Sequence, residues 1–195
     1  WLEERGPDAI VMACNTSCAI ADIYGWPRTR ATIFDIIDSA AIALQRVGAH
    51  RIGVIATTAT VRTGAYTRRI HAAIAGSAVF EVAAPALVPL VEAGAIEGET
   101  ARAAVADACA ELPGDLDAVV LACTHYPILD AHFASILGHA VVRVDPALVQ
   151  AERVAAFLQS RGAAEGNGVT EYVTNGDTER FEENVARIMK HPSHI

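Results

Sequence analysis

A short internal repeat constrains the fold of this chain more than any other feature. Residues 8–16 read DAIVMACNT and residues 117–125 read DAVVLACTH, so the two copies match in residue type at every position through the cysteine. Each apolar run is typical of a strand covered on both faces of a sheet. Because ligands bind beyond the carboxyl ends of strands in open α/β sheets, we expect Cys14 and Cys123 to lie at ligand-binding edges. Two related halves would place these thiols facing each other across a cleft.

The rest of the chain alternates short β-branched or apolar runs with longer helical segments, which is typical of βα units around mainly parallel sheet. The pattern predicts strands over residues 9–13, 32–37, 52–56, 79–83, 118–122, 141–144 and 171–174. It predicts helices over residues 16–24, 40–47, 60–74, 99–111, 128–137, 147–160 and 179–189. Residues 1–6 are typical of the last turn of a helix that a glycine ends.

Composition excludes several classes of protein. The net charge of −8 comes without a basic stripe, so nucleic acid is not an expected partner, and no apolar stretch approaches the roughly 20 residues that a membrane span needs. Four scattered cysteines do not form a secreted disulfide scaffold, so we expect a cytoplasmic protein. The one lysine, Lys190, lies in a tail poorly placed for a pyridoxal Schiff base, and no glycine-rich nucleotide-binding turn occurs. The sequence therefore predicts chemistry without a cofactor.

The two repeated thiols are candidates for acid/base chemistry. A thiol between a strand end and the first turn of a helix lies where backbone N–H groups and the helix dipole favour the thiolate. Simple packing stays open for each, because cysteine is among the most buried residue types. Cys18 and Cys109 fall inside predicted helices, where we expect them to fill the core.

A zinc site is an alternative that the same residues raise. Cys14, Cys18, Cys123 and His125 could supply four ligands. Their spacing lacks the tight Cys-x-x-Cys turns of structural zinc sites, so we expect no metal.

Two thiols on opposite sides of a substrate suit inversion at a carbon, since one group removes a proton while the other delivers one to the opposite face. Asn15, Thr16 and Thr124 offer amide and hydroxyl groups beside the thiols to hold carboxylates. Thr57 and Thr60 follow a predicted strand at another helix start, where either an anion seat or plain N-capping explains them.

His125 stands two residues after Cys123 and could polarise that thiol or pair with a substrate group. The other histidines, at positions 50, 71, 132, 139, 191 and 194, are predicted to be surface or structural residues.

Several blocks resemble those of glutamate racemases in the aspartate/glutamate racemase superfamily. The matching segments are residues 14–17 (CNTS), 52–57 (IGVIAT), 60–66 (TVRTGAY), 88–94 (VPLVEAG), 123–129 (CTHYPIL) and 174–177 (TNGD) followed by Phe181. The block CTHYP is specific to glutamate racemases, whereas CNT alone is shared across the superfamily.

The resemblance implies two pseudo-symmetric, mainly parallel α/β domains with a cofactor-free active site in the cleft between them. It implies a first domain of residues 1–37 plus 146–195 and a second of residues 38–145. Cys14 and Cys123 would be the acid/base thiols, with His125 assisting Cys123. The substrate site would contain Asn15, Thr16, Thr57, Thr60 and Thr124. The implied reaction is L-glutamate to D-glutamate, supplying peptidoglycan, and a homodimer stays open as the assembly.

The chain also departs from the family. Members begin with a strand leading to an Asp-Ser-Gly segment, whose Asp assists the first thiol, and carry a Pro-Tyr-Gly turn; neither motif occurs here. We therefore expect a chain that lacks the N-terminal segment of its family. Ile36-Ile37-Asp38-Ser39 stands where members more often have a Glu-Pro or Asp-Pro hinge. An aspartate racemase, a maleate-isomerase-like enzyme and an inactive fragment that only binds an acidic ligand stay open as alternatives.

Overall fold

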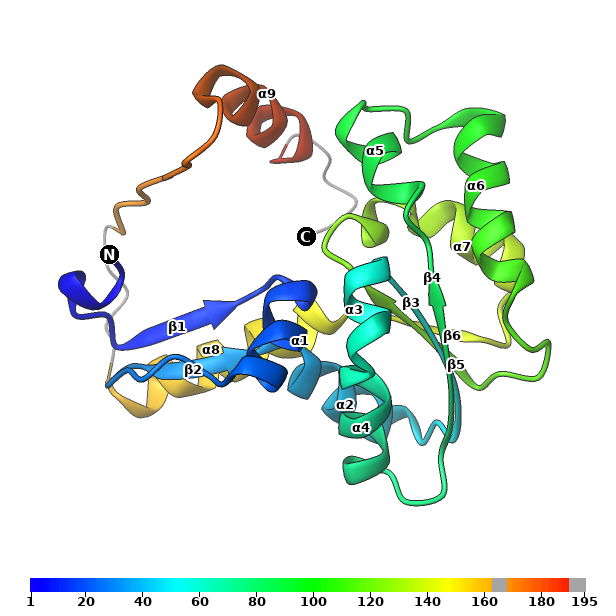
Figure 1. Ribbon diagram of the computed structural model, residues 1–195, viewed down its shortest axis with the longest axis horizontal. Helices are drawn as coiled ribbons and strands as arrows, with labels where there is room; N and C mark the ends of the chain where they lie inside the picture. The colour runs from blue at the N-terminus through cyan, green and yellow to red at the C-terminus, as the bar shows by residue number, and fades with distance from the viewer. Residues whose placement is uncertain (163–167, 190–195) are drawn as a thin grey trace. The chain divides into compact units, whose positions relative to one another are not determined.

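The computed structural model describes residues 1–162 and 168–189, and the chain divides into two compact units, residues 1–157 and 158–195. The first unit contains two sheets, one of two strands and one of four, and every strand pairing in them is parallel (Figure 1). The predicted α/β class with mainly parallel sheet is confirmed. The predicted domain boundaries near residues 37 and 145 stay a prediction.

The four-stranded sheet has the order β4-β3-β5-β6. Its strands are β3 (Arg51–Ala56), β4 (Ala78–Ala83), β5 (Ala118–Ala122) and β6 (Val142–Val144). Side chains alternate between its two faces: Ile52 and Val54 belong to one buried cluster, whereas Val119 and Leu121 belong to the other. Both faces are covered, which explains the unbroken apolar runs in the sequence.

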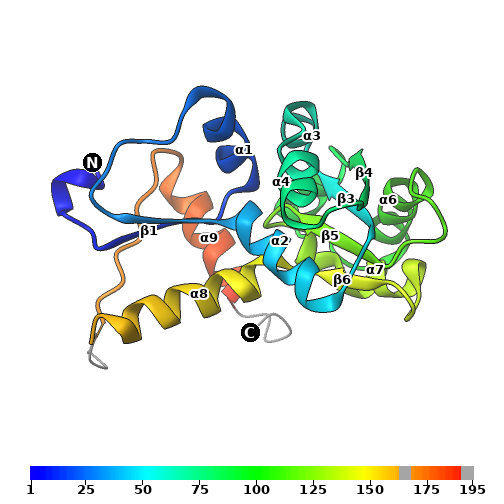
Figure 2. The same cartoon turned by 90° about the horizontal axis from the view of Figure 1, so that it is seen from below.

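Helices on the two faces are visible in Figure 2. The first cluster packs the sheet against α2 (Ile36–Val47) and α4 (Ala65–Ala73). The second packs it against α5 (Leu87–Glu92), α6 (Gly98–Ala110), the 3-10 turn η2 (Tyr126–Leu129) and α7 (Asp130–Leu137). A short helix, α3 (Thr58–Thr63), follows the carboxyl end of β3.

The two-stranded sheet pairs β1 (Ala9–Met12) with β2 (Thr32–Asp35) and is connected through α1 (Asn15–Tyr24). A 3-10 turn, η1 (Glu3–Arg5), precedes β1 and ends at Gly6 with φ of 58°, as the sequence predicts. Helix α8 (Pro146–Ser160) ties the two strand ends together, because the buried Gln150 Nε2 donates to the carbonyl oxygens of Met12 (3.1 Å) and Phe34 (3.0 Å).

Two predicted elements end earlier than expected, one at a side-chain cap and one at a glycine. The strand predicted over residues 32–37 ends at Asp35, because the Asp35 carboxylate accepts the Ile37 N–H (2.8 Å) and so starts α2 four residues earlier than predicted. The single helix predicted over residues 60–74 is wrong. Gly64 adopts φ of 64° and ends α3, after which α4 begins.

Other differences concern short segments. Helix α5 was not expected, and the segment predicted as the helix 128–137 begins with the 3-10 turn η2 before α7. The strand predicted over residues 171–174 is wrong, since this segment is irregular. Lys190 and the tail after it lie outside the described residues.

Besides the last residues of α8, the second unit contains one helix within its described part, α9 (Thr178–Met189). Asp177 precedes this helix, and its carboxylate accepts the Arg180 N–H (2.9 Å). No helix in the described parts of the chain is both long enough and apolar enough to cross a membrane.

Candidate active site

The two repeated thiols each follow the carboxyl end of a strand. Cys14 comes after β1 and is the exposed N-cap residue of α1, where its carbonyl oxygen accepts the Cys18 N–H (3.1 Å). Cys123 comes directly after β5, and its residue is 8% exposed. The repeat in the sequence therefore corresponds to two equivalent positions in two parallel sheets.

Strand register brings one predicted site residue next to Cys123. Ala56 at the end of β3 is the partner of Ala122 at the end of β5. Neighbouring strands lie about 4.8 Å apart, so Thr57 and Cys123, the residues that follow these two strand ends, lie side by side at the edge of the sheet.

Three predicted threonines form a closed triangle of hydroxyl groups. The Thr16 Oγ1 lies 2.9 Å from that of Thr57 and 3.0 Å from that of Thr60, and the last two are 3.0 Å apart. Thr16 belongs to the first turn of α1, whereas Thr57 caps α3 by accepting the Thr60 N–H (3.2 Å). The triangle joins the segment after Cys14 to the segment beside Cys123.

Asn15 is held by a residue to which the sequence analysis gave no role. The phenol of Tyr66 in α4 donates to the Asn15 Oδ1 over 2.5 Å, and both residues are buried. Burial raises the pKa of Tyr66 well above its usual value, so the phenol stays a neutral donor. With Oδ1 engaged, the NH2 group is the end of the Asn15 amide that can donate elsewhere. Tyr66 is the last residue of the TVRTGAY block (residues 60–66), and this block is the one sequence feature that could have pointed to a role for Tyr66.

A second set of polar side chains, those of His125, Thr124 and Glu92, lies beside Cys123. The His125 Nδ1 lies 3.8 Å from the Cys123 Sγ and 3.5 Å from the exposed Thr124 Oγ1. On the other side of the ring, His125 Nε2 lies 3.5 Å from Glu92 Oε1 at the end of α5. Among the described residues, Thr124 contacts His125 rather than the threonine triangle. Sequence reasoning missed Glu92 because its neighbour comes from a distant segment.

Tyr126 anchors the loop that carries Cys123 and His125. Its buried phenol donates to the Ala84 carbonyl oxygen (2.9 Å), and its N–H donates to the Cys123 carbonyl oxygen (3.0 Å). The phenol bond connects the loop after β5 to the segment after β4, and the N–H bond forms a turn within the loop.

The surroundings of Cys123 affect its ionisation. Burial raises the pKa of the Cys123 thiol, although the His125 backbone N–H opposes the rise, and a negative charge on Cys14 raises this pKa further. The expected effect of a backbone N–H on the thiolate is thus present at Cys123, but burial outweighs it. The coupling favours a pair that carries one thiolate and one thiol.

The other two cysteines lie in the core, as predicted. Cys18 is fully buried and donates its thiol to the Met12 carbonyl oxygen (3.4 Å), and Cys109 packs in the second cluster. Burial raises the pKa of Cys18 to about 12 and that of Cys109 to about 11. Neither is suited to proton transfer near neutral pH.

Within residues 1–162 and 168–189, no three His, Cys, Asp or Glu side chains come together as a potential metal-ligand set. The four residues of the zinc alternative are therefore not gathered at one point. Of the remaining histidines, His132 contacts the Ile96 carbonyl oxygen through Nε2 (2.9 Å), and His191 and His194 lie outside the described residues.

Comparison with known proteins gives consistent matches. The family model described as Asp/Glu/Hydantoin racemase matches residues 2–154. The glutamate racemase of Gloeobacter violaceus is 39% identical over 182 residues, which cover 93% of this chain and 68% of that protein. The chain thus spans about two thirds of the length of the curated relatives it matches.

Two solved structures are similar over nearly the whole chain. A Thermus thermophilus glutamate racemase in complex with β-chloro-D-alanine is 32% identical, with a TM-score of 0.82 over 96% of this chain and 70% of its own. A Francisella tularensis glutamate racemase in complex with D-glutamate is 25% identical, with a TM-score of 0.84 over 96% and 72% of the two chains. The predicted resemblance and fold class are confirmed.

Proposed function

The chain belongs to the aspartate/glutamate racemase family, and we propose that it interconverts L-glutamate and D-glutamate with Cys14 and Cys123 as the acid/base pair. The observation that carries this proposal is the equivalent position of the two thiols after parallel strands, with the threonine triangle between their segments. The names of the relatives, which are 32 to 39% identical, support glutamate as the substrate.

The proposed reaction needs one thiolate and one thiol at a time. The thiolate removes the α-proton from one face, and the opposite thiol gives its proton to the other face of the resulting carbanion. The first group becomes a thiol and the second a thiolate, so the charge of the pair is unchanged. The reverse reaction exchanges the roles. The electrostatic coupling of Cys14 to Cys123 supports this singly ionised pair.

The carboxylates of the substrate need neutral donors. The Asn15 NH2 group and the hydroxyls of Thr16, Thr57 and Thr60 are suitable, because a carboxylate that enters the triangle can replace hydroxyl–hydroxyl bonds with bonds to a charged acceptor. Thr124 is exposed beside His125 and would contact the other end of the substrate.

His125 is proposed to assist Cys123. Its Nδ1 faces the sulfur, and Glu92 faces its Nε2, an arrangement that fixes the orientation of the ring. In this role His125 stabilises the thiolate that Cys123 forms when it gives up its proton. This stabilisation offsets the rise that burial causes in the pKa of Cys123.

The setting of this activity is also part of the proposal. D-Glutamate produced in the cytoplasm would supply peptidoglycan synthesis, and no nucleic acid, membrane or resident cofactor takes part.

The test follows the optical activity of glutamate by circular dichroism, with EDTA present and no pyridoxal phosphate added. We expect both enantiomers to reach the same racemic end point, and aspartate to be turned over at least about a hundredfold more slowly. Preferred racemisation of aspartate would favour the rival superfamily activity. Glutamate binding in a calorimeter without turnover would favour the binding-only alternative, and loss of activity in EDTA would contradict the two-thiol chemistry.

A further inference from the structure

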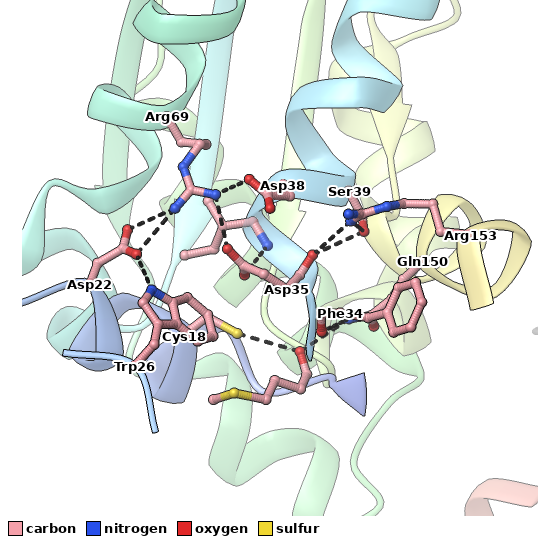
Figure 3. A network of polar contacts seen from close by, with 12 residues as sticks. Cys18, Asp22, Trp26, Phe34, Asp35, Asp38, Ser39, Arg69, Gln150 and Arg153 are labelled. Carbon is pink, nitrogen blue, oxygen red and sulfur yellow. Dashed lines mark hydrogen bonds and ion pairs between the residues drawn. The ribbon is translucent and has the colours of Figure 1, made fainter. Parts of the chain in front are cut away.

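One arginine outside the thiol site joins three elements of the first unit. The Arg69 guanidinium in α4 bonds to Asp22 near the end of α1 (Nη2 to Oδ1, 3.1 Å, and to Oδ2, 3.3 Å). Its Nη1 bonds to Asp35 at the end of β2 (3.0 Å) and to Asp38 in α2. Figure 3 shows Arg69 surrounded by these carboxylates.

The carboxylates depend on Arg69 for their charge balance. Three negative charges face one guanidinium, and Asp35 is only 4% exposed. Asp22 also accepts the Trp26 Nε1–H (3.1 Å), and Asp35 accepts a backbone N–H, but both of these donors are neutral. The nearby Arg153 donates to the main-chain oxygen of Asp35 (3.2 Å) rather than to its carboxylate. Without Arg69, partly buried like charges would repel one another across α1, β2 and α2.

Besides its packing in the first buried cluster, helix α1 is attached by side-chain bonds at both of its ends. Its first turn, directly after Cys14, is bound through Asn15 to Tyr66 and through Thr16 to the threonines of the α3 start. Its other end is bound through Asp22 to Arg69, one turn after Tyr66 in α4. A ten-residue helix is about 15 Å long, so the second attachment fixes the direction in which the helix axis points.

We propose that Arg69 is a positioning residue that fixes the orientation of α1 and thereby the placement of the Cys14 thiol. Arg69 does not act on the substrate itself. Loss of the Asp22 attachment would let α1 rotate about its first turn, which would change the direction in which the Cys14 side chain points at that turn, whereas Cys123 after β5 would keep its place. A sub-ångström to one-ångström displacement of an acid/base group is enough to slow proton transfer strongly. This inference rests on the proposed function of Cys14.

The first test measures α1 directly and needs no activity. Hydrogen–deuterium exchange is compared between the unmodified protein, Arg69→Met and the matched control Arg68→Met, an exposed neighbour in α4 that bonds the Thr63 carbonyl oxygen. We expect Arg69→Met to raise exchange in α1 at least about tenfold without a change in α6, and Arg68→Met to change neither. Unchanged exchange in α1 would overturn the proposal, as would equal acceleration in α6.

The second test separates the two thiols in deuterium oxide. Initial loss of the α-proton is followed by NMR, starting from each glutamate enantiomer. We expect Arg69→Met to slow proton loss from one enantiomer by about 10- to 100-fold and from the other by less than about threefold, because only Cys14 is displaced. Equal slowing for both enantiomers would overturn the positioning role.

Asp22→Ala, which removes the acceptor, supplies a milder variant in case Arg69→Met folds poorly. It breaks the α1 attachment while Arg69 keeps Asp35 and Asp38 paired, so the same one-sided slowing is expected and its absence would overturn the proposal. If the unmodified protein racemises no glutamate, the proposed function has failed, and the exchange measurement on α1 still decides whether Arg69 holds this helix.

Discussion

Replacing Tyr66 by Phe removes one hydroxyl group from the centre of the proposed substrate site. The phenol donates to the Asn15 Oδ1, and Asn15 is only 3% exposed, so water cannot readily replace the lost donor. A buried acceptor left without its partner costs about 1 to 3 kcal/mol. We therefore expect the free energy of unfolding of Tyr66→Phe to fall by about 2 kcal/mol.

The same change should affect binding more than chemistry. Without the Tyr66 bond the Asn15 amide can rotate, so its NH2 group no longer points consistently at the substrate. We expect KM for glutamate to rise about tenfold, equivalent to about 1.4 kcal/mol, with a smaller change in kcat. Because burial raises the pKa of Tyr66 well above its usual value, the effect should be the same from about pH 7 to about pH 9.

Urea unfolding and initial-rate kinetics measure the two effects. Tyr24→Phe is the matched control, since Tyr24 is 82% exposed and should tolerate the change. In an Asn15→Ala background, Tyr66→Phe should cost almost nothing further, because the shared bond is already lost. An unchanged urea midpoint together with a KM within about twofold of the parent would refute this reasoning.

Three further predictions concern other parts of the molecule. The free energy of unfolding should fall as pH rises above 9.0, the ordinary thiol value, because burial holds the pKa of Cys18 near 12 and that of Cys109 near 11 and the unfolded chain loses these protons first. Urea titrations should show this slope reduced in Cys18→Ala by up to about 1.4 kcal/mol per pH unit, and an unchanged slope would argue against it. Glu92→Gln should lower kcat about tenfold, because it weakens the interaction that orients the His125 ring, and should leave the urea midpoint unchanged. A parental kcat would exclude an orienting role for Glu92. Thr57→Val should lower the free energy of unfolding by about 1 kcal/mol, because it removes the cap of α3, and should raise KM for glutamate. An unchanged KM in steady-state kinetics would count against a substrate role for Thr57.

The sequence predicted the parts of this molecule that depend on local pattern. The apolar runs before Cys14 and Cys123 form strands β1 and β5, and Cys18 and Cys109 pack in the core. Periodicity failed where a single residue overrides it. Asp35 starts a helix inside a predicted strand, and Gly64 divides a predicted helix, because capping geometry is decided by one side chain or one backbone angle.

Contacts between distant segments could not be predicted in this way. Tyr66 lies 51 residues from Asn15, and Arg69 lies 47 residues from Asp22. Glu92 meets His125 only because β4 and β5 both flank β3. No spacing rule connects such pairs, so their roles depend on the folded arrangement.

Proton exchange in single-thiol variants tests the central claim most directly. Cys14→Ala and Cys123→Ala are each incubated in deuterium oxide with each glutamate enantiomer, and both racemisation and loss of the α-proton are followed. The two-thiol account predicts that neither variant racemises glutamate, that each still exchanges the α-proton of one enantiomer, and that this enantiomer differs between the two variants. Near-parental racemisation by either variant, or exchange of the same enantiomer by both, would contradict the account.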